Sequence, residues 1–93
     1  MDAELSEVPA QPGKVRVLFF SLLRDVAGCE ELEVEITEGE TVAMLLAGLA
    51  DRFPGLGEWD SKILVAVDQD FADREAVLSD GQEVAVMPPV QGG

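Results

Sequence analysis

One amphipathic segment restricts the folds open to this chain more than any other feature. Between residues 42 and 53, apolar side chains recur at steps of three and four, as the buried stripe of an α-helix requires. They are Val42, Leu45, Leu46, Leu49 and Phe53. Thr41 precedes the stripe as an N-cap candidate, and Pro54 with Gly55 ends it. The pattern predicts one main helix that covers one face of a small sheet.

Four other segments have the pattern of β-strands. Residues 14–20 (KVRVLFF) and 31–36 (ELEVEI) alternate with period two, and the second segment places glutamates on one face and Leu, Val and Ile on the other. Residues 63–67 (ILVAV) are continuously apolar, as in an interior strand, and residues 83–87 (EVAVM) predict the last strand. A short strand is expected near Phe71.

The remaining segments predict connections. Residues 21–28 (SLLRDVAG) predict a short helix with Ser21 as its N-cap and Gly28 as its stop. LGEWDS, residues 56–61, predicts a loop, and Asp80 is expected to form the tight turn at residues 79–81.

The order of these elements predicts the fold class. Strand, short helix, strand, helix, strand, small strand and strand is the order of the ubiquitin-like β-grasp, an α+β roll. We expect a mixed sheet of four to five strands packed on one main helix, with the first two strands paired and the last strand beside the first. The domain is predicted at residues 14–87, after a flexible acidic extension at residues 1–13 and before a tail at residues 88–93.

The charge of the chain excludes some partners. Nineteen Asp and Glu against six Lys and Arg give a net charge of −13, which repels phosphate backbones and anionic lipid surfaces. We therefore expect no nucleic-acid and no membrane partner. No Lys or Arg occurs between Asp25 and Asp51, so this acidic stretch is either a solvated face or a docking surface for a basic partner. No apolar run is long enough to span a membrane, and the start of the chain does not resemble a signal peptide, so a cytoplasmic protein is expected.

Familiar catalytic patterns are absent from the sequence. There is no His, no Gly-rich phosphate loop and no ligand cluster for a metal, and Cys29 is the only cysteine. Cys29 has no basic neighbour in sequence to stabilise a thiolate, which favours an inert thiol over a thioester or persulfide site. We expect this chain to bind no metal and no cofactor of its own.

The last six residues are the strongest functional candidate. They are Pro88, Pro89, Val90, Gln91, Gly92 and Gly93. The prolines lack N–H donors, so they stop the last strand and direct the chain outward. The two glycines have no Cβ and would fit a narrow channel that leads to the Gly93 carboxyl group. A frayed end without function is the alternative.

Three segments resemble the small subunit of molybdopterin synthase. They are KVRVLFFSLLRDVAG, ILVAVDQ and LSDGQEVAVMPPVQGG. The similarity runs from about Lys14 to Gly93, and the final segment is its most specific part. The matching residues there are Asp80, Gly81, Glu83, Val84, Pro88, Pro89, Val90, Gly92 and Gly93.

The resemblance implies a sulfur carrier. An adenylyltransferase related to the ubiquitin-activating enzymes would use ATP and Mg²⁺ to adenylate Gly93, and a persulfide donor would convert it to a thiocarboxylate. The tail would then enter the large subunit of the synthase, within a heterotetramer. Its sulfur would attack cyclic pyranopterin monophosphate and build the dithiolene of molybdopterin. This chain would donate sulfur without supplying catalytic side chains.

The resemblance also implies a docking patch on the sheet face opposite the helix. The matching residues are Phe20, Phe71 and Met87. Period two alone does not say which face of the sheet is outward, so burial of these residues in the core is the alternative.

Three other functions fit the same pattern. A sulfur carrier for the thiamine thiazole pathway shares the roll and the terminal glycines. A protein modifier would form isopeptide bonds to lysines through the same tail. A β-grasp binding module would have an incidental tail.

Overall fold

The computed structural model describes residues 13–89, which form a mixed five-stranded sheet with one main helix. The elements are β1 (Gly13–Phe19), α2 (Leu22–Ala27), β2 (Glu31–Ile36), α3 (Val42–Arg52), the 3₁₀ helices η1 (Pro54–Glu58) and η2 (Asp60–Lys62), β3 (Leu64–Val67), β4 (Asp70–Phe71) and β5 (Glu83–Met87). The predicted α+β fold class is confirmed.

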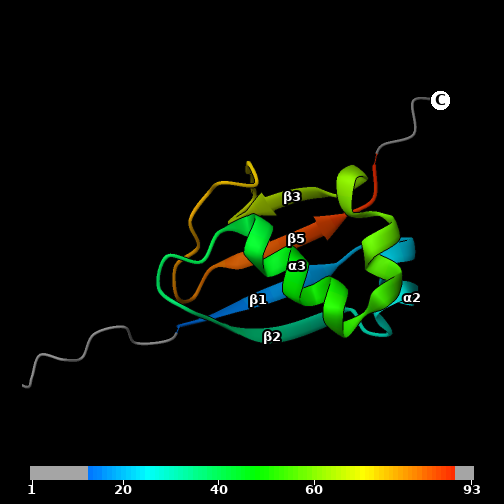
Figure 1. The fold of residues 1–93 in the computed structure, drawn as a ribbon, viewed down its shortest axis with the longest axis horizontal. Coiled ribbons are helices and arrows are strands. Elements are labelled where there is room, and N and C mark those ends of the chain that lie inside the picture. Colours follow the sequence, from blue (N-terminus) through cyan, green and yellow to red (C-terminus); the bar gives the residue numbers. More distant parts are fainter. Residues whose placement is uncertain (1–12, 90–93) are drawn as a thin grey trace, which may run out of the picture.

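The strand order across the sheet is β2-β1-β5-β3-β4 (Figure 1). β1 pairs antiparallel with β2 and parallel with β5, as predicted. β3 pairs antiparallel with both β5 and β4. The last strand is therefore central in the sheet, and β2 and β4 are its edges.

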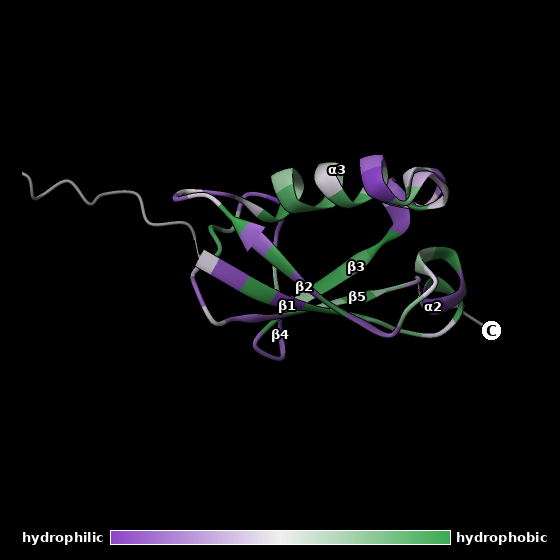
Figure 2. Cartoon of the chain, turned by 90° about the horizontal axis from the view of Figure 1, so that it is seen from below, coloured by the Kyte–Doolittle hydropathy of each residue, from purple (hydrophilic) through white to green (hydrophobic). Residues whose placement is uncertain are grey.

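The core lies between α3 and one face of the sheet (Figure 2). α3 buries the four stripe residues that lie within it, and four strands of the sheet contribute inward positions. These inward positions are Val15, Val17, Phe19, Ile36, Val65, Val84 and Val86. The rings of Phe19 and Phe53 meet edge to face, with centroids 6.0 Å apart. Each fully buried side chain of this kind contributes about 1.5–3 kcal/mol.

The ends of α3 agree with the sequence. The side-chain oxygen of Thr41 accepts a hydrogen bond from the Met44 N–H at 3.2 Å, so the predicted N-cap is confirmed. The helix ends at Arg52, and Phe53 follows as its C-cap before Pro54.

The prediction that Ser21 caps α2 is wrong. Ser21 has φ 57° and ψ −137°, and its side chain makes no capping hydrogen bond. Instead, the Leu23 N–H donates to the Phe20 carbonyl at 3.1 Å, which closes a tight turn between β1 and α2. Because the turn satisfies this N–H, the helix needs no side-chain cap there. Gly28 ends α2 with φ 78°, as predicted.

The predicted loop at residues 56–61 is also wrong, because η1 and η2 occupy it. Leu56 is buried and Trp59 packs against the core. Only Leu56 of this segment is buried. Short-range backbone hydrogen bonds such as Trp59 N–H to Leu56 O, at 3.0 Å, form the 3₁₀ turns that hold Leu56 and Trp59 against the core.

Three boundaries differ slightly from the prediction. β1 begins at Gly13 and ends at Phe19, and β3 begins at Leu64. Asp80 does more than form a turn, since its Oδ1 accepts the Lys14 N–H at 2.8 Å and joins the start of β1 to the turn before β5. Within residues 13–89, no helix is long and apolar enough to cross a membrane.

Candidate functional site

The candidate site begins where β5 ends. Met87 is the last residue of β5 and pairs with Leu64 of β3. Pro88 and Pro89 follow outside the strand and are half-buried. They lack the N–H groups that a further ladder bond would need. Val90, Gln91, Gly92 and Gly93 lie outside the described residues, so their roles stay predictions.

The sheet face opposite α3, called here the open face, carries an apolar band. One row across the sheet contains Leu18, Ala85, Ala66 and Phe71, which are partners in the strand register. The next row contains Leu64 and Met87. Phe20 follows Phe19, which pairs with Val86, so Phe20 lies beside Met87 at the end of this row.

The exposure of individual side chains shows which face of the sheet carries Phe20, Phe71 and Met87. Phe71 is 77% exposed and Phe20 is 45% exposed, while Met87 is half-buried. Their neighbours Phe19 and Val86 are in the core. Core burial of the three candidates is therefore excluded, and all three lie on the open face. Exposed large apolar side chains gathered on one face are typical of protein interfaces.

The open face also carries a charged band over β2, β1 and the start of β5. It consists of Lys14, Arg16, Glu31, Glu33, Glu35 and Glu83. Lys14 Nζ lies 3.9 Å from Glu33 Oε1, and Arg16 lies 3.7 Å from Glu31 and 3.1 Å from Glu83. Because these side chains are largely exposed, each ion pair contributes no more than about 1 kcal/mol. Their arrangement matters more for partner selection than for stability.

The described residues offer little other chemistry. Among residues 13–89, no three His, Cys, Asp or Glu side chains gather to hold a metal ion. Cys29 is half-buried and free. It borders a shallow hollow at the end of α2 that Ser21, Arg24 and Glu30 also line.

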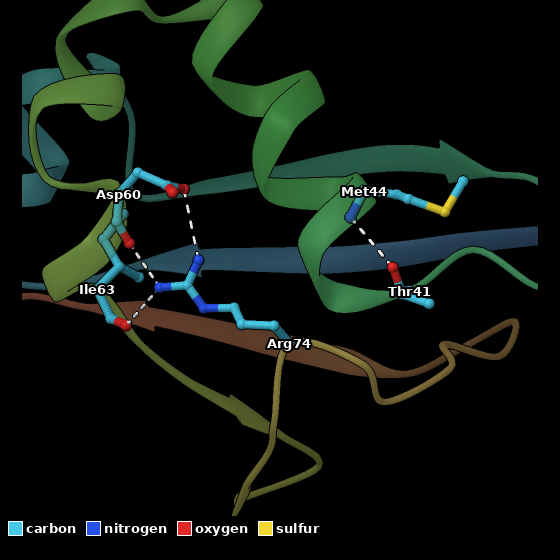
Figure 3. A network of polar contacts seen from close by, with 5 residues as sticks. All are labelled: Thr41, Met44, Asp60, Ile63 and Arg74. Carbon is cyan, nitrogen blue, oxygen red and sulfur yellow. Dashed lines mark hydrogen bonds and ion pairs between the residues drawn. The ribbon is translucent and has the colours of Figure 1, made fainter.

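Sequence analysis missed the role of Arg74, a half-buried residue in the segment between β4 and β5. Figure 3 shows its guanidinium group reaching toward η2. Nη2 donates to the carbonyl oxygens of Asp60 at 2.5 Å and Ile63 at 3.2 Å, and Nη1 lies 3.5 Å from Asp60 Oδ1.

The backbone of the same segment covers the start of α3. The carbonyls of Arg74 and Ala76 accept the N–H groups of Ala43 and Val42, each at 2.9 Å. These N–H groups have no partner inside the helix. A period-two pattern of Ala72, Arg74, Ala76 and Leu78 is the signal that could have revealed this inward-facing arginine.

Comparison with protein families shows which family this chain belongs to. The ThiS family model matches residues 17–93. The chain belongs to the ThiS family. The curated relatives of this chain include proteins named molybdopterin synthase sulfur carrier subunit. The one from Mycobacterium tuberculosis is 39% identical over 83 residues, covering 86% of this chain and 98% of that protein. The one from Escherichia coli is 37% identical over 81 residues, covering 85% and 99%.

Solved structures of other proteins have a fold similar to that of this chain. A Pyrococcus furiosus chain named for molybdopterin converting factor, subunit 1, has a TM-score of 0.77 and 31% identity, covering 84% of this chain and 99% of that one. The small archaeal modifier protein 1 of Haloferax volcanii has a TM-score of 0.76 and 26% identity, covering 84% and 99%.

Two further structures extend the comparison. Subunits 1 and 2 of the molybdopterin-converting factor of Helicobacter pylori were solved as a complex. The matching chain has a TM-score of 0.60 and 25% identity, covering 86% of this chain and 99% of that one. A Caldiarchaeum subterraneum ubiquitin, at 12% identity and a TM-score of 0.61 over 89% of this chain and all of that one, shows the fold alone. The ubiquitin-like β-grasp prediction is confirmed.

Proposed function

We propose that this chain is the sulfur carrier subunit of a molybdopterin synthase. One observation carries the proposal. The ThiS family match runs to residue 93 and so includes the tail, and the relatives named as this subunit are covered over nearly their whole length.

The proposed reacting group is the carboxyl group of Gly93. As a carboxylate it is anionic and has no leaving group, so it must first be activated. An adenylyltransferase related to the ubiquitin-activating enzymes would use ATP and Mg²⁺ to form the acyl adenylate. The outer sulfur of a persulfide donor would then attack the acyl carbon and displace AMP. A thiol would reduce the resulting acyl disulfide, which releases the thiocarboxylate and forms a disulfide on the donor. That sulfur would attack cyclic pyranopterin monophosphate in the large subunit.

The chain has features that suit this delivery. β5 ends at Met87, and the tail begins with two residues that have no N–H group, Pro88 and Pro89. Gly92 and Gly93 have no side chain to obstruct a narrow channel. Because the chain has a net charge of −13, we expect the cations that hold the substrate phosphate to come from the large subunit.

We propose the apolar band as the docking surface for the large subunit. Phe20, Phe71 and Met87 lie on this band, and the first two are the most exposed of its large side chains. Phe20 and Met87 are at the end of the sheet from which Pro88 leaves, so docking there would bring the tail to the partner. The complex of subunits 1 and 2 in the Helicobacter pylori relative supports this kind of partner.

Mass spectrometry of the intact protein tests the proposal. The chain is incubated with its activating enzyme, ATP, Mg²⁺, a persulfide donor and a thiol reductant. We expect a mass increase that corresponds to the exchange of one oxygen for sulfur at Gly93. A variant with one extra residue after Gly93 is the matched control, and it should keep its fold and gain no sulfur. An unmodified carboxylate in the complete reaction, or equal sulfur transfer in the extended variant, would contradict the proposal.

A protein modifier is the second candidate function, and the likeness to small archaeal modifier protein 1 favours it. In that case the activated Gly93 would form isopeptide bonds to lysines. Ladders of larger conjugates that disappear when Gly93 is deleted would support the modifier. Co-purification with a molybdopterin synthase large subunit would support the carrier, and co-purification with a thiazole synthase would indicate the thiamine pathway.

A further inference from the structure

The outer edge of β2 has no partner within residues 13–89. β2 is the first strand in the sheet order, and among the described strands it pairs only with β1. Figure 1 shows it as the outermost strand, with β1 between it and β5. A free edge of this kind can receive a further strand.

Alternate residues of β2 bond to β1, and this alternation identifies the backbone groups that remain on the outer edge. The Phe19 N–H donates to the Glu30 carbonyl at 2.9 Å, so these two residues form a hydrogen-bonded pair. Such pairs recur at every second residue of an antiparallel ladder. Leu32, Val34 and Ile36 therefore bond to β1, since they lie opposite Val17, Val15 and Gly13 in the register.

The alternate residues of β2 face away from β1. Glu31, Glu33 and Glu35 occupy the positions between the bonded pairs, so their N–H and C=O groups point to the free edge. The pairing of β1 agrees, because Arg16 and Phe20 use their N–H groups toward β5 and not toward β2. The edge therefore offers three donors and three acceptors to an added strand.

The side chains along this edge differ between the two faces. Glu31, Glu33 and Glu35 are exposed on the open face. Leu32 and Val34 point to the α3 side and are only half-buried, at the margin of the core. An added strand would thus meet carboxylates on one face and apolar surface on the other.

β1 shows which sequence pairs with β2. Its Lys14 and Arg16 lie beside the β2 glutamates, while Val15 and Val17 lie opposite Val34 and Leu32. Basic and apolar residues therefore alternate in the strand that β2 already binds. Two cations of β1 face three glutamates of β2, and Arg16 is also shared with Glu83, so negative charge remains in excess along the edge.

We propose that the free edge of β2 binds an extended segment of a partner protein, with alternating basic and apolar residues, by antiparallel strand addition. Backbone hydrogen bonds would give affinity, and the alternating side chains would give specificity. A second copy of this chain fits poorly, because pairing two β2 edges would bring glutamates together. The edge is separated from Phe71 by β1, β5 and β3, so this surface goes beyond the proposed docking of the large subunit.

A capped, fluorescent peptide with the β1 sequence GKVRVLF is the probe. Fluorescence anisotropy should show binding to the full chain at low salt, and binding should weaken at about 1 M salt, where the Debye length is about 3 Å. A peptide with glutamate in place of its lysine and arginine should bind at least about tenfold more weakly. Hydrogen exchange should slow at the amides of Glu31, Glu33 and Glu35 when the peptide is bound.

Two peptide variants separate strand addition from simple charge attraction. Methylation of the lysine and arginine amides removes the N–H groups that face β2, and it should abolish binding. Methylation of the two valine amides leaves those groups intact, and the peptide should still bind.

Two variants of the chain provide the matching test. Glu33→Lys should weaken binding about tenfold. Glu38→Lys makes the same change in net charge in the turn after β2, at a residue that is exposed and outside the strand, and it should have little effect. No detectable binding, equal losses in both variants, equal binding of both methylated peptides, or self-association of the chain in place of peptide binding would each overturn the proposal.

Discussion

Replacement of Arg74 by methionine tests how the segment before β5 is held. The variant keeps most of the side-chain length but removes both hydrogen bonds to backbone carbonyls and the contact with Asp60. A hydrogen bond from a charged donor contributes about 1.5–3 kcal/mol. Water can replace part of this, because the Arg74 side chain is 35% exposed. We expect the free energy of unfolding to fall by about 2 kcal/mol, and Tm to fall by about 10 °C.

Urea unfolding followed by the fluorescence of Trp59, the only tryptophan, measures the free energy of unfolding. Trp59 directly precedes η2, where Arg74 binds. Asp60→Asn is the matched control, since it removes the ion pair and leaves both carbonyl acceptors in place. The Asp60 side chain is 50% exposed, so this change should cost less than about 1 kcal/mol. The reasoning is refuted if Arg74→Met is as stable as the parent chain, or if Asp60→Asn costs as much as Arg74→Met.

Three further predictions follow from exposure and backbone geometry. Phe71→Ser should change the free energy of unfolding by less than about 0.5 kcal/mol, yet weaken binding of the large subunit at least about tenfold in calorimetry. Val77→Ser, at another exposed apolar residue, should leave that binding unchanged, and equal losses would refute the docking surface. Gln69→Gly should raise the free energy of unfolding by about 1 kcal/mol, because Gln69 has φ 75°, which glycine adopts without strain. The urea midpoint should rise accordingly, and a lower midpoint would contradict this. Gly13→Ala should lower the free energy of unfolding by about 1–2 kcal/mol, since the new Cβ would lie 2.8 Å from Asp80 Cβ. Gly48→Ala places its Cβ in open space and should stabilise α3 by up to about 1 kcal/mol. A Gly13→Ala chain more stable than the Gly48→Ala chain would exclude the predicted clash.

Local patterns were sufficient to predict most of the elements. The stripe from Val42 to Leu49 gave α3 because side chains three and four residues apart share one helix face. Period two gave β1 and β2 for the corresponding reason. The predictions failed at Ser21 and at residues 56–61, where a tight turn and short 3₁₀ helices satisfy the backbone without a side-chain signal.

The candidate site divides in the same way. The tail is conspicuous in the sequence alone, because prolines and glycines have definite backbone properties wherever they occur. The direction of Phe20, Phe71 and Met87 was open in the sequence, since alternation defines two faces without saying which one α3 covers. The exposure of Phe71 and the burial of Phe19 decided it.

The sequence by itself determined the helix stripe, the strand periods and the proline-glycine tail, because each depends on residues that are neighbours along the chain. Only the tertiary structure decided that β2 lies at an edge of the sheet formed by residues 13–89, that Arg74 points inward to η2, and that Asp80 binds the N–H of Lys14, 66 residues away. These contacts depend on which strands become neighbours and which face is covered. Packing of the whole chain sets both, and no local pattern contains them.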